Sequence, residues 1–187
     1  IEKGELTGWD DIRLGTIKAL RRKGFTKDAI VKFIRETGIG PADANVSLDK
    51  LASFNKNVID EKTCRVFFIQ DPVKIKIEGA PKIKTELDLH PKDKKGGRKF
   101  LTNEDFYITK EDLTNLKENH HYRLMGCLNF VRKKDKFIFH STKQEDFKGQ
   151  QMIQWLPYDY NHVIIELMTE DAKKIRGLGE EYILNLK

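Results

Sequence analysis

The chain has 187 residues, of which 39% are hydrophobic and 34% charged, and its formal net charge is +6. Such a chain is long enough for one large or two small domains, and its composition excludes collagen-like, low-complexity and mainly disordered proteins. Its apolar runs are of strand length and it opens without a secretory signal, so we expect a cytoplasmic protein with no membrane partner, while the basic charge favours a polyanionic partner.

The first 57 residues have the apolar periodicity of short helices. Asp10 or Asp11 is predicted to cap the first helix, and Gly24 is predicted to end it. The apolar residues of this helix recur at helical spacing and are Leu14, Ile17 and Leu20. Its other face is cationic, a pattern that by itself is more often solvated surface than a binding site.

Two further helices are predicted in the same region. Thr26 and Ser47 are the expected N-caps, because each precedes a stretch with helical apolar spacing. Gly38 is expected to end the second helix, and a turn is expected over residues 38–41. We expect these short helices to form one helical subdomain over residues 1–57.

From Cys64 onward the periodicity changes to two, which predicts strands. The clearest alternation of apolar and charged side chains is in residues 72–78. Further strands are expected over residues 65–70, 82–89, 106–109, 122–132, 136–140, 151–155 and 162–168. A short helical turn is expected at residues 110–118, and a loop rich in Lys and Gly is expected at residues 91–99.

This order of elements predicts an α+β protein that is mainly β. A short N-terminal helical subdomain would be followed by closed or nearly closed antiparallel β-barrels, because many short strands follow one another with few helices between them. The expected parts are the helical subdomain at residues 1–57, a partial first barrel at 58–112, and a second barrel with a returning segment at 113–187.

The cysteines, histidines and glycines indicate no catalytic or metal site. Cys64 and Cys127 each lie in an apolar strand-like run, so two buried, reduced thiols are expected. His120 and His121 are adjacent and would face opposite sides of a strand, so no metal site is predicted. The glycine spacing in residues 177–180 does not match a phosphate loop and is expected to allow a turn. A hydrolytic enzyme using a histidine stays an alternative, although no motif selects a nucleophile.

Several motifs, in order along the chain, resemble those of the glutamyl- and glutaminyl-tRNA synthetases. Residues 8–13 read GWDDIR and residues 20–24 read LRRKG. The usual forms in that family are G-W-D-D-P-R and L-R-R-R-G, so Ile12 replaces a proline and Lys23 an arginine. Further similar stretches are 71–74 (DPVK), 90–91 (HP), 97–98 (GR), 122–125 (YRLM) and 153–157 (IQWLP). Ordered agreement over nearly the whole chain is more specific than any single motif.

The resemblance implies the C-terminal, anticodon-binding portion of a glutamyl-tRNA synthetase of the archaeal and eukaryotic type. Its β-barrels would be of a kind that also occurs in a ribosomal protein. The parent enzyme would join glutamate to tRNA(Glu) using ATP and magnesium. The family's ATP-handling motifs, H-I-G-H and K-M-S-K-S, are missing here, so we expect no catalytic residue and no cofactor bound by this chain. The implied partners are tRNA(Glu), tRNA(Gln) as an alternative, and the parent's catalytic domain.

The resemblance also implies roles for individual cationic residues. Arg65 and Arg123 match positions at which the family's arginines read anticodon bases, a task that suits a guanidinium because it can both pair with and stack on a base. The residues expected to contact the tRNA backbone are Arg13, Lys18, Arg21, Arg22, Lys23 and Arg98. Without the resemblance, a surface salt bridge is an equally good interpretation of Arg65.

Two other functions stay open. A glutaminyl-tRNA synthetase shares this architecture, and the choice between glutamate and glutamine is made in the absent active site. A free-standing basic β-barrel could instead bind single-stranded RNA or a protein partner. Aromatic side chains on an exposed strand face, on which bases can stack, would favour such a module. Most aromatic residues here instead occupy the alternating strand positions that are predicted to be buried.

Overall fold

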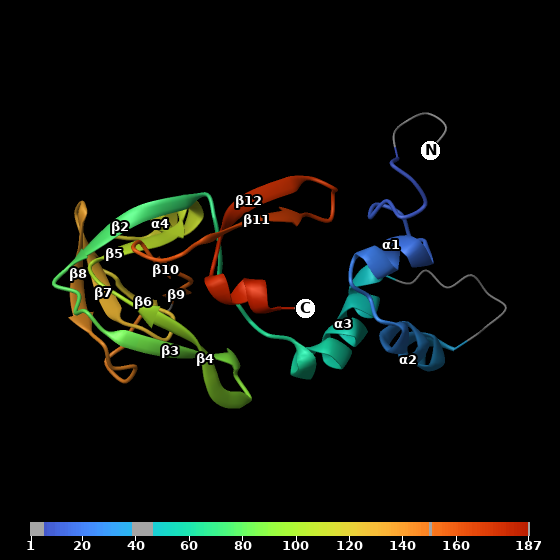
Figure 1. Ribbon diagram of the computed structural model, residues 1–187, viewed down its shortest axis with the longest axis horizontal. Coiled ribbons are helices and arrows are strands. Elements are labelled where there is room, and N and C mark those ends of the chain that lie inside the picture. The colour runs from blue at the N-terminus through green and yellow to red at the C-terminus, as the bar shows by residue number, and fades with distance from the viewer. Residues whose placement is uncertain (1–5, 39–46, 150, 187) are drawn as a thin grey trace. The chain divides into compact units, whose positions relative to one another are not determined.

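The computed structural model describes residues 6–38, 47–149 and 151–186, and the chain divides into two compact units (Figure 1). The first unit comprises Ile1–Thr63 and Met168–Lys173, and the second comprises Cys64–Leu167 and Lys174–Lys187. The first unit carries the N-terminal helices, whereas nearly all strands belong to the second. The architecture is therefore mainly β with short N-terminal helices, as the sequence predicts.

The helices of the first unit begin at hydroxyl side chains. They are α1 (Ile17–Arg22), α2 (Lys27–Thr37), α3 (Leu48–Ile59) and the 3-10 turn η1 (Asp60–Lys62). Thr26 and Ser47 cap α2 and α3 as predicted, since each side-chain oxygen accepts the N–H three residues later. Gly38 follows α2, while the rest of the predicted turn lies outside the described residues. No helix in the described part of the chain is long and apolar enough to cross a membrane.

The first helix starts later than predicted. Thr16 is its N-cap, so neither Asp10 nor Asp11 caps α1. The carboxylate of Asp11 is buried and accepts the backbone N–H of Arg13 at 3.0 Å, which stabilises the turn before the helix instead. Because the helix begins at Ile17, this residue lies at its end and is 67% exposed, which differs from the predicted apolar face.

Contacts between α2 and α3 hold the first unit together. Phe33 and Phe54 pack edge to face with their ring centroids 5.6 Å apart. Asn55 of α3 is buried, accepts the backbone N–H of Thr26 at 2.9 Å and donates to the carbonyl of Gly24 at 3.1 Å. These two bonds fix the connection between α1 and α2 against α3, so α1 is attached to a packed scaffold.

The strands of the second unit form three sheets within the described residues. In chain order the elements are β1 (Phe68–Gln70), β2 (Pro72–Glu78), β3 (Lys84–His90), β4 (Asp93–Leu101), β5 (Asp105–Thr109), α4 (Lys110–Asn115), β6 (His121–Leu124), β7 (Asn129–Lys133), β8 (Lys136–Ser141), β9 (Gln151–Ile153), β10 (Leu156–Pro157), β11 (Val163–Met168), β12 (Lys174–Gly179) and the 3-10 turn η2 (Glu181–Asn185). Their orders are β10-β5-β2-β8-β7-β6-β9, β1-β12-β11 and β3-β4. The sequence predicts antiparallel pairing throughout. The β2–β8 and β6–β9 pairs are parallel, so that prediction is wrong for these two pairs.

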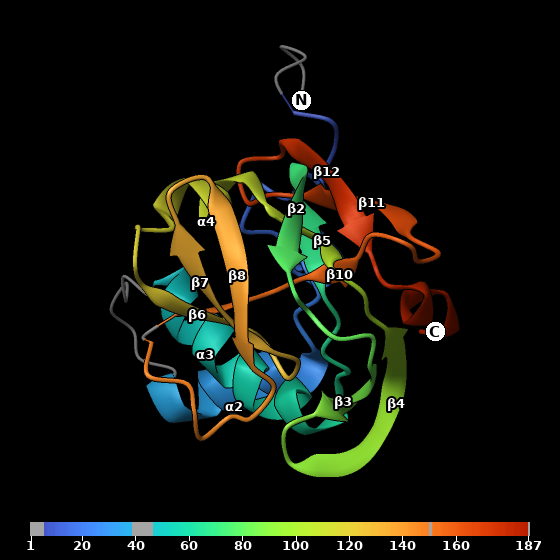
Figure 2. The same cartoon turned by 90° about the vertical axis from the view of Figure 1, so that its left-hand side faces the viewer.

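The segment predicted as a Lys- and Gly-rich loop is mostly strand. β4 runs from Asp93 to Leu101 and pairs with β3, and Figure 2 shows the two as a long curved hairpin. The pairing is irregular between Asp88 and His90, near the glycine pair at residues 96–97. Lys and Gly have low strand propensity, so the composition of this segment predicts a loop. The segment forms a strand because it pairs with β3.

Two other glycine-containing segments also differ from prediction. The strand expected over residues 122–132 is divided into β6 and β7 by a turn at Gly126, whose φ is 67°. Gly177 lies in β12 rather than in a turn, and a Cβ there would lie 2.4 Å from the carbonyl oxygen of Ile69. Glycine at this position therefore allows the close approach of β12 to β1.

Trp155 lies in the core of the second unit, as the sequence predicts. Its side chain is 0% exposed, and its ring centroid lies 6.2 Å from Phe67, 5.4 Å from Phe100 and 5.5 Å from Phe106. Its indole N–H donates to the carbonyl of Met125 at 2.9 Å. The residue thus joins segments far apart in sequence and satisfies its own polar atom.

The two cysteines differ in exposure, although the sequence predicts that both are buried. Cys127 is buried, but Cys64 is exposed because it lies before β1 and outside any strand. Burial raises the pKa of the Cys127 thiol to about 12, against the opposing influence of the nearby Arg123. The Cys127 thiol is therefore both inaccessible and protonated at neutral pH.

We expect a maleimide at pH 8 to modify Cys64 rapidly and to spare Cys127 until urea unfolds the chain. Thiolates are the reactive form of cysteine, and Cys127 lacks both the thiolate and access to the reagent. Intact-mass spectrometry counts the adducts. The Cys64→Ser variant is the matched control and should gain no adduct while folded, whereas rapid double labelling of the native chain would contradict the burial of Cys127.

Candidate functional site

Cationic side chains gather on α1 and at its C-terminal end. Lys18, Arg21 and Arg22 are exposed and occupy positions i, i+3 and i+4, so they share one helix face. Lys23 follows directly and is half-buried. Basic residues in the last turn also complement the negative end of the helix dipole. The structure therefore brings together four of the six residues for which backbone contacts are predicted.

Two arginines of this region are held by neighbouring aspartates. Arg13 binds Asp11 through a fork, with Nε 2.9 Å from Oδ1 and Nη2 2.7 Å from Oδ2, and this pairing holds the pKa of Asp11 well below its ordinary value. Arg22 pairs with Asp10 at 3.0 Å. The cations of this group that form no ion pair with a described residue are Lys18, Arg21 and Lys23.

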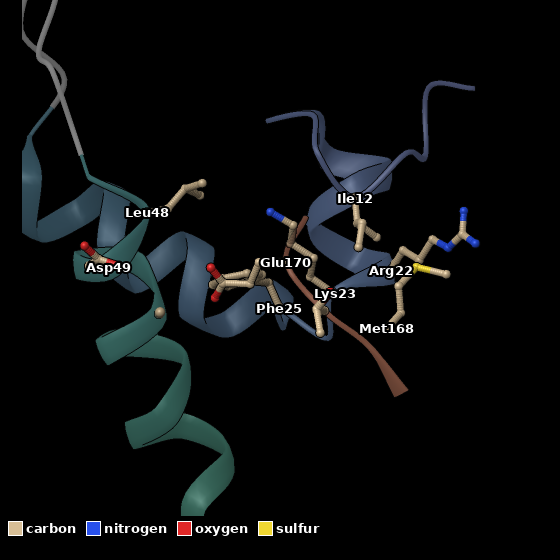
Figure 3. A pocket seen from close by; sticks show the side chains of 10 residues that line it. Ile12, Arg22, Lys23, Phe25, Leu48, Asp49, Met168 and Glu170 are labelled. Carbon is tan, nitrogen blue, oxygen red and sulfur yellow. The ribbon is translucent and has the colours of Figure 1, made fainter. Parts of the chain in front are cut away.

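A hollow of about 500 Å³ lies beside these cations in the first unit. Arg22 and Lys23 line it together with Asp49 and Glu170 (Figure 3). Phe25 adds an apolar wall, and in Figure 3 the guanidinium of Arg22 extends away from it. Carboxylates on the rim would repel a phosphate, so the outer face of α1 is a better anion surface than the hollow.

A pocket of about 370 Å³ lies in the second unit, beside the segment that leads into β1. Its volume falls at the lower end of the roughly 300–1,000 Å³ that is typical of small-molecule sites. The polar residues that line it are Arg65, Asp88, Arg98 and Gln154. The apolar ones are Val66, Phe67, Leu87, Pro91 and Met125. Two of the predicted tRNA contacts, Arg65 and Arg98, are therefore brought to one cavity.

Backbone pairing positions the polar groups of this pocket. The N–H of Arg65 donates to the carbonyl of Leu89 at 2.7 Å, which fixes the exposed Arg65 next to β3. Asp88 accepts the N–H of Gly96 at 2.9 Å across the β3–β4 hairpin. An arginine offers donors, an aspartate offers acceptors, and Gln154 offers both. Together they can hydrogen-bond to the mixed edge of a planar heterocycle.

Arg98 lies inside the unit rather than on a solvated loop. Its side chain is 7% exposed, and its Nη1 lies 2.8 Å from Oε1 of Glu180, which is itself fully buried. Its guanidinium stands 4.7 Å from the ring centroid of Phe67. β4 directs this side chain inward, so Arg98, for which a tRNA-backbone contact is predicted, is buried.

Arg123 is likewise buried, at 5% exposure, and does not line the pocket of Arg65. Its Nη1 donates to Oδ1 of Asn129 at 2.7 Å and to the carbonyls of Thr142 and Lys143 at 3.4 and 3.3 Å. Burial lowers the pKa of this guanidinium from its ordinary value. Arg123 therefore attaches the segment after β8 to β6 and β7.

Sequence reasoning missed three polar residues around the Arg65 pocket. Asp88 and Gln154 lie within predicted strands and give no separate signal. Glu180 has partners 82 and 113 residues away, at Arg98 and Phe67, so nothing in its local sequence indicates its role. Among the described residues, no group of three or more His, Cys, Asp and Glu side chains is placed to hold a metal ion.

Comparison with known proteins places these features in context. A family described as "tRNA synthetases class I (E and Q), anti-codon binding domain" matches residues 63–147. The chain is 40% identical over 195 residues to a glutamate–tRNA ligase of Methanosphaera stadtmanae, covering 100% of this chain and 34% of that protein. It is 39% identical to the Pyrococcus furiosus ligase and 34% identical to the Methanocaldococcus jannaschii ligase, each time covering 97% of this chain and 33% of the relative. The chain thus spans about a third of the length of the curated relatives it matches.

Proposed function

Because the chain belongs to the class I glutamyl and glutaminyl tRNA synthetases, as the anticodon-binding region of an archaeal-type glutamate–tRNA ligase, we propose that it binds tRNA(Glu) and reads its anticodon. The observation that carries this proposal is the pocket beside Arg65. Its four polar lining residues come from four separate segments, and most of its lining lies in the region matched by the family, residues 63–147. The matched relatives are glutamate–tRNA ligases, which favours tRNA(Glu) over tRNA(Gln).

An unstacked anticodon base suits this pocket. Single-stranded RNA is recognised through hydrogen bonds to exposed base edges and through stacking on flat side chains. Arg65 would donate to the base, Asp88 would accept from it, and Gln154 would do either. A base with the wrong edge would leave one of these groups unpaired in a partly desolvated site, and that cost provides discrimination.

For the two buried arginines we propose indirect contributions. Arg123 fixes the carbonyls of Thr142 and Lys143, so it would hold this segment in position for an anticodon contact. Arg123 is 5% exposed and already donates to Asn129, Thr142 and Lys143, so direct base reading would require its side chain to move. Arg98 would shape the Arg65 pocket rather than clamp a phosphate.

The tRNA backbone is assigned to the first unit. Exposed cations attract phosphates through the release of condensed counterions, independently of sequence. The residues proposed for these contacts are Arg13, Lys18, Arg21, Arg22 and Lys23. Arg21 is the best single probe among them, because it is exposed and pairs with no described carboxylate.

In the longer protein, a catalytic domain would join glutamate to tRNA(Glu) with ATP and magnesium. We further propose that the protein is cytoplasmic and that its sheets belong to β-barrels. Their boundaries would lie near the predicted ones, with a helical part at residues 1–57, a partial first barrel at 58–112 and a second barrel at 113–187.

The Arg65→Ala variant tests the base-reading role. It is expected to reduce the preference for the cognate anticodon by about 10-fold or more, since a good bidentate base contact is worth about 1–3 kcal/mol. Fluorescence anisotropy would measure binding of the 187-residue chain to tRNA(Glu) and to transcripts changed at each anticodon position in turn. The loss should be confined to one position. The exposed Arg176→Ala is the matched control in the same unit, and equal weakening for all transcripts by Arg65→Ala would contradict the assignment.

The Arg21→Ala variant tests the backbone contact. It should weaken binding to cognate and anticodon-changed tRNA alike, because phosphates carry no sequence information. The slope of log K against log salt concentration should fall in magnitude by about 1, as expected for one lost phosphate contact. Binding titrations at several salt concentrations give this slope. Lys32→Ala on the exposed part of α2 is the control, and an unchanged slope for Arg21→Ala would show that Arg21 meets no phosphate.

A further inference from the structure

We propose that Glu180 is a positioning residue for anticodon recognition, whose buried carboxylate sets the geometry of the Arg65 pocket from behind. The inference rests on the proposed function of that pocket. Glu180 itself does not line the cavity, but it binds two residues that do, Phe67 and Arg98. It would therefore act on the base through its neighbours.

One carboxylate oxygen joins three segments of the chain. Oε1 of Glu180 accepts the backbone N–H of Phe67 at 2.5 Å and Nη1 of Arg98 at 2.8 Å. Phe67 is two residues after Arg65, so this bond fixes the backbone that presents the proposed base-reading side chain. Arg98 belongs to β4, while Glu180 directly follows β12. A residue near the C-terminal end of the chain thus fixes the positions of two residues, Phe67 and Arg98, that line a pocket formed by earlier segments.

The same contact also fixes a cation against an aromatic ring. The guanidinium of Arg98 is 4.7 Å from the ring centroid of Phe67, and both residues line the pocket. Without the carboxylate, Arg98 would be a buried cation with no counter-charge and would turn toward the cavity or toward solvent. The wall would then change in both shape and charge.

The pair is not arranged for the greatest stability. Oε2 of Glu180 and Nε of Arg98 are buried and make no hydrogen bond within the described structure. A buried ion pair with such incomplete bonding contributes little net stability over apolar residues of similar volume, but it can select one geometry among several. The incomplete bonding therefore favours a role of the Arg98–Glu180 pair in binding specificity over a role in overall stability.

The Glu180→Gln variant separates these roles. Glutamine retains an oxygen that can accept the N–H of Phe67, but it removes the charge that holds Arg98. The preference for the cognate anticodon is expected to fall by roughly 5- to 10-fold, a coupling typical of residues that share one network. The loss should occur at the same anticodon position as in Arg65→Ala, and Glu181→Gln, an exposed neighbour, should leave the preference unchanged.

A double-mutant cycle with Arg65→Ala gives the decisive measurement. If Glu180 acts through the pocket, Glu180→Gln should cause no further loss of preference once Arg65 is absent. Should Glu180→Gln fail to fold, the apolar pair Glu180→Leu/Arg98→Met takes its place, and it should fold yet show the same reduced preference. Retained preference in the folded Glu180 variants, with preference lost in Arg65→Ala, would overturn the positioning role alone. Retained preference in Arg65→Ala as well would overturn the proposed function of the pocket.

Discussion

Replacing Trp155 with alanine is expected to lower the free energy of unfolding of the second unit by about 3–5 kcal/mol, the range for truncating a large aromatic residue in a core. Trp155 is fully buried and packs against Phe67, Phe100 and Phe106. The substitution also leaves the carbonyl of Met125 without its donor. Urea denaturation followed by far-ultraviolet circular dichroism measures the loss without depending on tryptophan fluorescence.

Trp9 provides the matched control because it is 66% exposed. Trp9→Ala should change the free energy of unfolding by no more than about 0.5 kcal/mol, as is usual for surface substitutions. Trp155→Phe should fall between the two, since it keeps part of the ring contacts and loses the hydrogen bond. Equal stability of Trp155→Ala and Trp9→Ala would contradict the packing described for the core.

Elements fixed by local chemistry could be predicted from the sequence. The caps of α2 and α3 need only a hydroxyl residue three positions before a backbone N–H, and both Thr26 and Ser47 satisfy this. β2 alternates apolar and charged residues, and its buried residues are Ile75 and Ile77. The interactions that determine these helix caps and this strand involve residues close together in the sequence, so the local sequence pattern is enough to predict them.

Elements fixed by distant partners could not be predicted in this way. β4 has a composition typical of a loop and becomes a strand because β3 lies beside it. Arg98 and Arg123 look like exposed cations in the sequence, yet each is buried against groups supplied by other segments. Arg65 carries a predicted role in the sequence, but the pocket around it depends on Asp88 and Gln154, which only the fold brings near. The architecture around these three arginines therefore depends on contacts between distant segments, which local sequence patterns do not contain.

The buried pair of Arg98 and Glu180 leads to the second large expected effect. Arg98→Met should lower the free energy of unfolding by about 3–5 kcal/mol, because removing one member of a buried ion pair leaves the other as an uncompensated charge. Glu180 is 0% exposed, so water cannot readily take the place of the guanidinium. Urea denaturation of the 187-residue chain measures the change. Arg176→Ala, which removes an exposed partner of Glu166, is the control and should leave the midpoint nearly unchanged.

Adding Glu180→Leu to Arg98→Met should restore most of the lost stability, because the second substitution removes the unpaired charge and fills the space with apolar atoms. This reversal distinguishes an electrostatic cause from simple loss of packing, since packing losses at two neighbouring residues would accumulate. A double variant less stable than Arg98→Met would show that the volume of Glu180, rather than its charge, matters at this position. A recovered double variant would instead be a stable chain without the charge pair, and its anticodon preference would then report what the pair contributes beyond stability.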